Sequence, residues 1–214
     1  MNRTRCSMLG SIVAAALVLA APAFAGPPLL CFPFDTGGVK TLPMGSGGWK
    51  GVDAKYDVSR LTEDTVALLT ATPVVARMET IRRATIYAST HPQVASDLLA
   101  RLQARAAIRS ANAPSAVFDF GYLVETYKQA SFLFSQPVKG LDAIDGYQLV
   151  LKAGALQNDP AMQFAAAVIT QGSASAARRA EYRDHLQRAI DGAKSDAALS
   201  ASVTKHFRET GELR

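Results

Sequence analysis

Arginine residues are the side chains whose spacing in this chain best suits a chemical role, which is the binding of negative charge. Arg101, Arg105 and Arg109 recur every four residues, so a helix here would place their guanidinium groups along one face. Three stacked cations repel one another unless water or acidic groups surround them. The spacing predicts a contact surface for an acidic partner or an anionic envelope surface. The alternative is an ordinary solvated helix face.

A second group of arginines precedes this one. Residues 59–112 hold seven arginines and four acidic residues, and Arg77, Arg82 and Arg83 lie in their first half. Glu79 lies four residues before Arg83, a spacing that supports an ion pair on a helix surface. We interpret these arginines in the same two ways, as an extension of the contact surface or as a solvated face.

Aromatic side chains gather near the start of the chain. Trp49 is the only tryptophan, and Phe32 and Phe34 lie close to it in the sequence. These rings could line a binding groove against a neighbouring helix. Alternatively, they are anchors that hold an irregular segment onto the rest of the protein.

Other patterns argue against catalysis and metal binding. No two of the histidines His91, His185 and His206 lie three or four residues apart, so no helix face offers two imidazole ligands. Asp142 and Asp145 suit the positive start of a helix. No G-x-S-x-G elbow, phosphate-binding G-x-G-x-x-G loop or Walker motif occurs. The sequence predicts no metal or cofactor and favours a non-catalytic protein.

The first 25 residues have the organisation of a secretory signal peptide. Arg3 and Arg5 precede an apolar stretch, and Ala23 and Ala25 form an A-x-A cleavage site. Export to the periplasm or outside the cell is therefore expected. Loss of two arginines lowers the net charge from +5 to +3, which gives no case for nucleic-acid binding. No later apolar run approaches the roughly 20 residues that a transmembrane helix needs.

Cleavage after Ala25 would remove Cys6 and leave Cys31 as the only thiol. A single cysteine in an exported protein suggests a free thiol or an intermolecular disulfide. The alternative is a small buried hydrophobe between Leu30 and Phe32. The mature chain can form no internal disulfide.

The remaining chain divides by composition into two parts. Residues 26–58 contain seven of the fifteen glycines and four of the ten prolines, which predicts an irregular N-terminal arm. Its apolar side chains would be left in water unless the arm packs onto the domain that follows. Val52 to Val58 could include a short strand.

Residues 59–214 are predicted to form a helical domain of eight helices. Thr72-Pro73, His91-Pro92 and Asp159-Pro160 each pair a capping residue with a proline that opens a helix. Such short connections make successive helices antiparallel neighbours. We predict an all-α fold in which helix pairs stack as a bundle or a short helical-repeat array. The helices are expected from Ser59 or Thr62, after Thr72-Pro73, after His91-Pro92, from Ser115 to Phe134, from Leu141 to Leu156, after Asp159-Pro160, from Ser173–Ser175 to Gly192, and from Asp196 to Phe207, ending at Gly211.

Two stretches have the pattern of a known helical repeat. Residues 180–190 (AEYRDHLQRAI) and residues 155–160 (ALQNDP) resemble the second helix and the proline turn of a tetratricopeptide-type repeat. The aromatic-Leu-Gly-aromatic set of a first repeat helix is absent. Residues 26–35 (GPPLLCFPFD) resemble the start of exported bacterial proteins of unknown function. The repeat resemblance covers about 40 residues and implies stacked helix pairs that bind a protein or peptide.

Together these observations predict an exported, non-catalytic helical scaffold that binds a protein or peptide in the cell envelope. Arg101, Arg105, Arg109 and Trp49 are the candidate binding residues, and Cys31 is the candidate free thiol. The alternative is an enzyme, or an enzyme subunit, with a site between the N-terminal arm and the helices. The sequence does not determine the oligomeric state.

Overall fold

The computed structural model describes residues 26–109 and 113–212 of the chain. This part of the protein is all-α, as predicted, and contains no strand. The predicted signal peptide lies outside the described residues. The α-helices are α1 (Pro28–Cys31), α2 (Leu61–Leu68), α3 (Val74–Ala88), α4 (Pro92–Ala107), α5 (Ala113–Gln129), α6 (Gly146–Gln157), α7 (Pro160–Gln171), α8 (Ala176–Ala193) and α9 (Ala197–Glu209), with 3-10 turns η1 (Gly48–Lys50), η2 (Val58–Arg60) and η3 (Leu141–Ala143).

Side-chain caps start several of these helices. Asp145, Asp159, Ser175 and Asp196 each accept a hydrogen bond from a backbone N–H in the first turn of α6, α7, α8 and α9. Such caps satisfy donors that have no partner inside the helix. Proline at the first turn of α4 and α7 adds a backbone angle already suited to a helix.

The helix predicted from Ser115 to Phe134 ends earlier, at Gln129. Beyond it the chain turns, and the Ser135 N–H donates to the Ser89 carbonyl at the end of α3, 3.1 Å away. Phe134 then packs edge-on against Tyr127, with 4.9 Å between ring centres. The apolar pattern continued past the helix because Leu133 and Phe134 are partly buried, although Phe132 between them and the helix is 60% exposed.

The helix predicted from Leu141 to Leu156 is divided in two. The turn η3 ends at Ala143, and Ile144 is extended, with φ −108° and ψ 124°. Asp145 then caps α6, accepting a hydrogen bond from the Gln148 N–H at 3.2 Å. The Asp145 cap therefore sets the start of α6, although the spacing of apolar residues is continuous from Leu141.

The short strand predicted within Val52 to Val58 is wrong. The Tyr56 N–H donates to the Asp53 carbonyl at 3.0 Å, and the Asp53 carboxylate accepts from the Lys55 N–H at 2.9 Å. Asp57 then caps η2. These local hydrogen bonds compete successfully with extended backbone.

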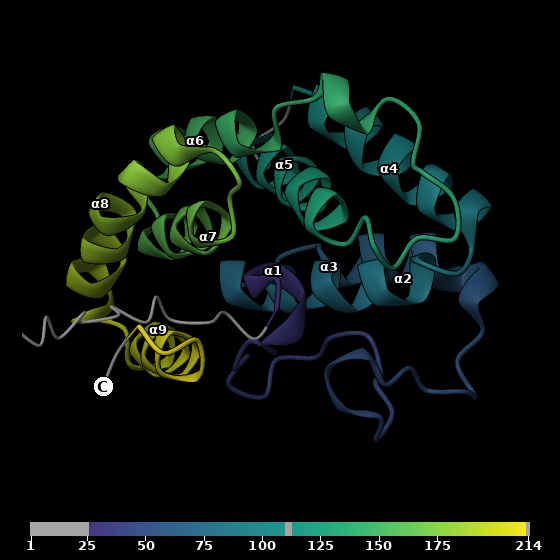
Figure 1. The fold of residues 1–214 in the computed structure, drawn as a ribbon, viewed down its shortest axis with the longest axis horizontal. Coiled ribbons are helices and arrows are strands. Elements are labelled where there is room, and N and C mark those ends of the chain that lie inside the picture. The colour runs from purple at the N-terminus through teal and green to yellow at the C-terminus, as the bar shows by residue number, and fades with distance from the viewer. Residues whose placement is uncertain (1–25, 110–112, 213–214) are drawn as a thin grey trace, which may run out of the picture.

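Consecutive helices pack mainly against each other. In Figure 1, α5, α6, α7 and α8 follow one another around an arc, while α2, α3 and α4 form the opposite end. The helices α5 and α6 form one closely packed hairpin, and α7 and α8 form another. This is the stacking of antiparallel pairs that short connections produce.

The hairpin of α5 and α6 depends on two glycines. A methyl group added at Gly121 would lie 2.6 Å from the Gly146 carbonyl oxygen, and one added at Gly146 would lie 2.4 Å from the Gly121 carbonyl oxygen. Both distances are too short for a real contact, so only glycine permits this backbone approach. A glycine inside a helix usually weakens it. Gly146, however, is the first residue of α6 and lies where α5 and α6 cross.

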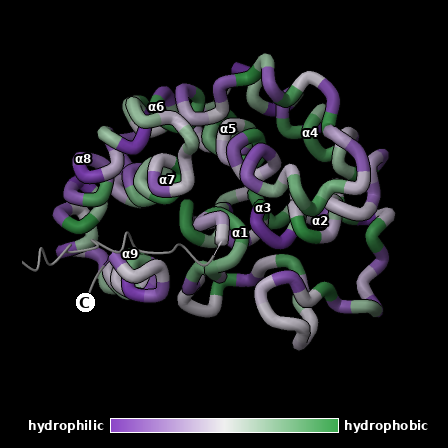
Figure 2. Tube along the Cα trace, in the orientation of Figure 1, coloured by the Kyte–Doolittle hydropathy of each residue, from purple (hydrophilic) through white to green (hydrophobic). Residues whose placement is uncertain are grey.

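The core runs between the helices and continues beneath the N-terminal arm (residues 26–58). Leu29, Leu30 and Leu42 of the arm have no exposed surface, and α1 contacts α3, α5 and α7. Figure 2 shows hydrophobic stretches of the trace around α1, in the middle of the molecule. None of the helices in residues 26–109 and 113–212 is long and apolar enough to span a membrane.

Candidate functional site

The three arginines that were predicted to share one helix face do not share one environment. Arg101 and Arg109 are exposed, whereas the Arg105 side chain is 24% exposed and turns toward α5. Between them, Ile108 is 60% exposed at the end of α4. α4 ends at Ala107, and Ile108 has extended backbone with ψ 126°, so Arg109 does not continue the helix face that carries Arg101, contrary to the prediction from the spacing. The solvent-facing group is therefore two arginines with an apolar side chain.

Arg105 instead belongs to a buried charge cluster. Its Nη1 atom lies 3.8 Å from Oδ2 of Asp119, which has no exposed surface. Arg77 donates to both carboxylate oxygens of Asp119, at 2.9 and 2.8 Å. Burial raises the pKa of Asp119 to about 6, and Arg77 and then Arg105 oppose that shift. These residues connect α3, α4 and α5, so the expectation of a surface position for Arg77 is wrong.

A second buried cluster lies on α3 under the N-terminal arm. Glu79 has no exposed surface, and its Oε2 accepts from Arg82 Nε at 2.8 Å. Its Oε1 accepts from Arg82 Nη2 at 2.8 Å and from Arg83 Nε at 2.6 Å. The Phe34 N–H of the arm donates to the same carboxylate at 3.0 Å. Arg82 is only 2% exposed, so the interpretation of this residue as a surface cation is also wrong.

The two guanidinium groups then bind carbonyl oxygens of the arm. Arg82 Nη1 donates to the carbonyls of Leu30 and Trp49, both at 2.9 Å. Arg83 Nη1 donates to the Leu42 carbonyl. One carboxylate and two arginines thus satisfy polar backbone groups at four points along the arm. We call Glu79, Arg82 and Arg83 the α3 charge cluster.

A tyrosine extends this attachment along α3. The Tyr87 hydroxyl donates to the Pro43 carbonyl and accepts from the Asp53 N–H, both at 2.9 Å. Its ring lies 4.8 Å from that of Tyr56. The arm is therefore held by α3 over its whole length, from Leu30 to Asp53.

Trp49 and Cys31 lie on a small apolar cluster that is separate from the arginines of α4. The cluster is formed by Leu30, Ile86 and Ala130, and both residues pack against it half-buried. Ala130 follows the C-terminal end of α5, whereas Arg105 meets α5 near its start. Burial raises the pKa of the Cys31 thiol, against a lowering effect of Arg82, and Cys31 is a free cysteine. These surroundings suit a small hydrophobe better than a nucleophile.

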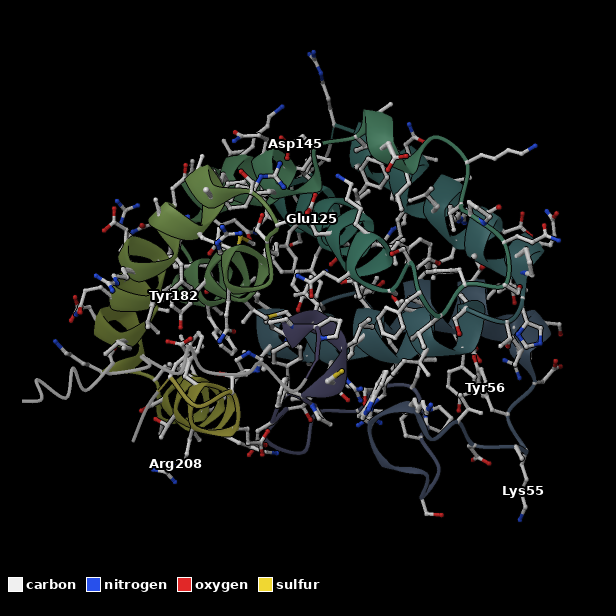
Figure 3. All side chains as sticks on the ribbon, viewed as in Figure 1. Lys55, Tyr56, Glu125, Asp145, Tyr182 and Arg208 are labelled. Carbon is white, nitrogen blue, oxygen red and sulfur yellow. The ribbon has the colours of Figure 1, made fainter. Side chains whose placement is uncertain are left out.

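A cavity of about 410 Å³ lies between the N-terminal arm and α2. Tyr56 and Asp64 meet there, with the Tyr56 hydroxyl donating to Asp64 Oδ2 at 2.9 Å. Arg60 Nη2 lies 3.3 Å from the other carboxylate oxygen, and the exposed Lys40 lines the same cavity. Burial and the hydrogen bond to Asp64 raise the pKa of Tyr56, so its hydroxyl stays protonated. Figure 3 shows Tyr56 on the side of α2 that the arm covers.

A polar junction joins α6, α7 and α8. The Tyr147 hydroxyl contacts the Glu181 carboxylate and lies 2.6 Å from His185 Nε2. His185 Nδ1 lies 2.9 Å from Gln163 Oε1. Burial and then Arg188 lower the pKa of His185. Tyr147 is 1% exposed, and these contacts join α6, α7 and α8.

Arg178 ties the same junction to α5. Its guanidinium lies 3.4 Å from Glu125 and 2.7 Å from Asp145, and 5.1 Å above the Tyr147 ring. Figure 3 labels Glu125 and Asp145, which lie near each other at the α5–α6 end of the arc. This arginine therefore has acidic partners, as do Arg77 and Arg82.

His206 of α9 is buried among aromatic rings. It is 1% exposed, and neither ring nitrogen has a hydrogen-bond partner within the described residues. The rings of Phe34, Phe164 and Phe32 lie 5.2, 5.6 and 5.9 Å away between centres. Burial lowers the pKa of His206 to about 3, so the imidazole is neutral at physiological pH.

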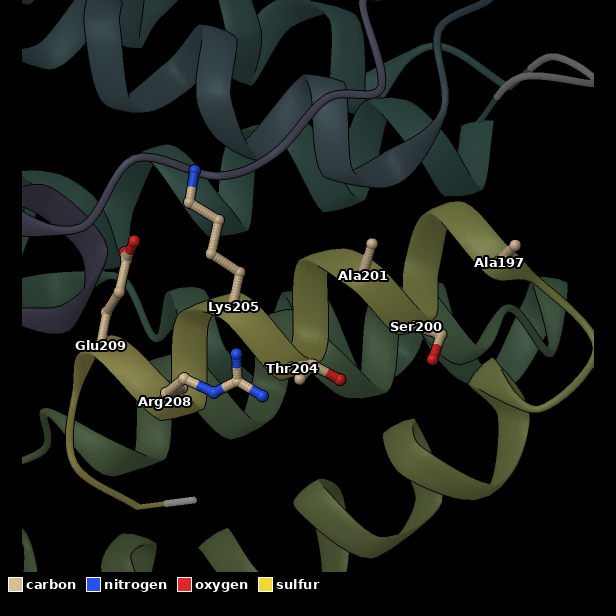
Figure 4. Close-up of a pocket in the computed structure, with 7 residues that line it drawn as sticks. All are labelled: Ala197, Ser200, Ala201, Thr204, Lys205, Arg208 and Glu209. Carbon is tan, nitrogen blue, oxygen red and sulfur yellow. The ribbon is translucent and has the colours of Figure 1, made fainter. Parts of the chain in front are cut away.

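A hollow of about 550 Å³ follows α9. Figure 4 shows its seven lining side chains, and all of them come from this single helix. Lys205 and Arg208 diverge from the helix instead of converging. A groove with one wall cannot surround a small ligand, so it is not a candidate active site.

No group of three or more metal-binding side chains in residues 26–109 and 113–212 could hold a metal ion. No protein-family model, curated protein sequence or solved structure matches this chain. The assignment of function therefore depends on the chemistry of the surfaces and cavities described above.

Several residues of these clusters were not identified from the sequence. Asp119 is the lone acid between Val117 and Leu123 in an otherwise apolar stretch, and that contrast is a signal for a buried ion pair. Glu181 and His185 are four residues apart on one helix, a spacing that could have indicated their contact. Nothing in the sequence places Phe34 beside Glu79, because that contact joins residues 45 positions apart.

Proposed function

We propose that this protein is an exported helical scaffold that binds an acidic protein or peptide through the end of α4. The binding surface is formed by Arg101, Ile108 and Arg109, and we call it the α4 surface. The observation that carries the proposal is Ile108, a large apolar side chain that is 60% exposed between two exposed arginines. Apolar contact flanked by cations suits a partner that presents an apolar residue among acidic ones.

The stacking of the helices supports a scaffold role. The stretches that resemble a tetratricopeptide-type repeat fall on the end of α6, the turn into α7 and the middle of α8. Helices α5 with α6 and α7 with α8 form two successive hairpins. In repeat proteins such stacked pairs provide extended binding surfaces.

The use of the other charged side chains supports the same proposal. Arg77, Arg82 and Arg178 have acidic partners inside the protein. Arg101 and Arg109 form no ion pair within the described residues. They can therefore pair with a partner without breaking an internal contact.

The proposal is tested by charge reversal on the α4 surface. We expect the double variant Arg101→Glu and Arg109→Glu to lose a partner that the wild-type protein captures from a cell-envelope extract at low salt. Reversal of Lys152 and Arg188, which are exposed on α6 and α8, is the matched control and should retain the partner. Capture by wild type should weaken at about 0.3 M salt, where charges are screened within a few ångströms.

Two results would contradict a protein partner on this surface. Equal capture by both double variants would show that α4 is not the contact. Salt-sensitive binding of wild type to anionic lipid vesicles, abolished only by the α4 reversal, would assign the surface to envelope lipid. Replacement of Ile108 by Ser separates the apolar contribution and should weaken capture without altering the net charge.

A second candidate function uses the cavity between the N-terminal arm and α2. Its carboxylate, hydroxyl and two cations are the kinds of group found in enzyme sites, and this favours an enzyme or enzyme subunit. Native mass spectrometry of protein recovered from an envelope fraction tests this. A small-molecule adduct on wild type that is absent from the Lys40→Ala and Arg60→Ala double variant would support it, and an adduct unaffected by both substitutions would oppose it.

A further inference from the structure

The connection between α5 and α6 (residues 130–145) carries a large aromatic side chain that the chain itself leaves uncovered. Phe132 is 60% exposed, whereas its neighbours Leu133 and Phe134 are partly buried. Figure 1 shows this connection looping past α4 on its way to α6. Aromatic side chains are enriched at protein–protein interfaces compared with the rest of the surface. Phe132 is therefore the side chain of this segment that is best suited to contact another protein.

A hollow of about 210 Å³ opens on the same connection. Ser131, which directly precedes Phe132, is one of the residues that line it. An apolar cavity of roughly 150 Å³ is large enough to bind benzene, so this hollow has room for one aromatic ring. Its apolar walls come from the end of α5 and from the connection, and they are formed by Tyr127, Phe134, Pro137, Val138 and Leu141.

Hydrogen bonds hold this connection in place at both ends. The Ser135 N–H donates to the Ser89 carbonyl at 3.1 Å, and Lys128 Nζ donates to the Ile144 carbonyl at 2.6 Å. Stacking of Phe134 on Tyr127 fixes one wall of the hollow. A ring and a hollow on a fixed segment lose less conformational freedom on binding than they would on a mobile loop.

Two side chains of opposite charge lie on the same connection. Lys139 and Asp142 are both exposed, and Asp142 lines the hollow. Neither forms an ion pair with another residue of the described chain. These two charges cancel, so together they select neither an acidic nor a basic partner. They can, however, pair with the same two residues of a second copy that faces the first in the opposite direction.

We propose that the connection between α5 and α6 forms a two-fold contact between two copies of this protein. Phe132 of each copy would fill the hollow of the other, and Lys139 of each copy would pair with Asp142 of the other. A two-fold contact uses the same patch on both copies, so a projecting ring and a receiving hollow on one segment are satisfied together. We call this patch the dimer face. It is separate from the α4 surface and does not depend on the scaffold role.

Sedimentation equilibrium of the purified protein tests the proposal. We expect a monomer–dimer equilibrium with a dissociation constant of about 100 μM or tighter. Phe132→Ser should weaken dimerisation at least about tenfold, because the ring is the apolar centre of the contact. Leu156 is 63% exposed on α6, so Leu156→Ser removes an equally exposed apolar side chain and is the matched control. It should leave the dissociation constant unchanged. Thermal unfolding verifies that each variant is folded.

Exchange of the two charges tests the two-fold symmetry itself. Lys139→Asp leaves two acidic side chains on the dimer face, and Asp142→Lys leaves two cations. Each variant alone should dimerise several-fold more weakly than wild type, because like charges would meet across the axis. An equimolar mixture of the two variants should form heterodimers, because each acid then faces a lysine. The double variant Arg101→Glu and Arg109→Glu changes only the α4 surface and should dimerise like wild type.

Three outcomes would overturn the proposal. The first is a monomer at every concentration up to about 500 μM. The second is a dimer that Phe132→Ser leaves as stable as wild type, which would place the contact elsewhere on the molecule. The third is a mixture of Lys139→Asp and Asp142→Lys that associates no better than either variant alone, which would show that these charges do not meet across a two-fold axis.

Discussion

The α3 charge cluster and the environment of His206 on α9 are both buried, and they satisfy their polar groups in opposite ways. Every charged atom of Glu79 has a partner, and the guanidinium groups around it also bind the backbone of the arm. His206 has no partner on either ring nitrogen within the described residues and is surrounded by aromatic rings. Paired charges give a position-specific attachment, whereas a neutral imidazole without hydrogen-bond partners depends on remaining uncharged.

This contrast assigns different roles to two sets of contacts along the arm. Near Leu30, Leu42 and Trp49 the arm is held by hydrogen bonds from α3. Near Phe32 and Phe34 it is also packed on His206, which must stay neutral to remain there. The first attachment depends on charge, and the second depends on the absence of charge.

The largest effect is expected from Glu79→Ala. The substitution leaves Arg82 buried without its carboxylate and leaves the Phe34 N–H without an acceptor, so we expect a loss of about 4 kcal/mol in the free energy of unfolding. Glu63 is exposed in the first turn of α2, and Glu63→Ala is the matched control. Urea denaturation measures both, and a loss below about 1 kcal/mol for Glu79→Ala would contradict the structural role of the cluster.

The next effect concerns pH and the His206 environment. The folded-state pKa of about 3 lies below the usual 6.5, so the unfolded chain binds a proton that the folded chain does not. The contribution of neutral His206 is complete above pH 6.5 and is lost as the pH falls toward 3. At pH 4 the loss is on the order of 3 kcal/mol.

The free energy of unfolding, measured at several values between pH 7 and pH 4, tests whether stability falls with the pH. We expect His206→Phe to reduce the fall in stability over that range. Phe164→Leu disturbs the same packing without removing a titrating group, so it should lower stability by a similar amount at each pH. An identical pH profile for wild type and His206→Phe would show that protonation of His206 does not limit acid stability.

A smaller effect is expected at Tyr87, which extends the charge-based attachment. Tyr87→Phe removes hydrogen bonds to the Pro43 carbonyl and the Asp53 N–H, so we expect a loss of about 1 kcal/mol. The arm near Asp53 should also become more sensitive to proteolysis, and the sites are identified by mass spectrometry. Unchanged cleavage would show that the apolar contacts alone hold this part of the arm.

Much of the helical pattern was predictable because its signals are local. Proline placed the starts of α4 and α7, and the caps Asp159 and Asp196 placed those of α7 and α9, whereas the predicted cap His91 makes no side-chain cap hydrogen bond. Errors occurred where a longer-range contact decided the outcome. The segment that follows α5 makes a hydrogen bond from Ser135 to Ser89, 46 positions away, and the spacing of apolar residues gives no sign of this contact.

The candidate binding residues also combine local features, which the sequence predicts, with long-range contacts, which it does not. The four-residue spacing of Arg101, Arg105 and Arg109 is a local property, but the exposure of each side chain is not. Arg105 turns inward because Asp119 of α5 is buried beside it. Arg82, in a stretch that resembles a surface helix, is covered because the arm crosses α3 at this point.

The sequence by itself determined that this protein is all-α and where most of its helices begin, because caps, prolines and apolar spacing act within a few residues. It also determined the excess of arginine over acid in residues 59–112. Only the tertiary structure decided which arginines are available to a partner and which polar atoms have none. Burial and hydrogen bonding depend on groups brought together from distant parts of the chain, and a charge has a different role in water than in contact with a buried carboxylate.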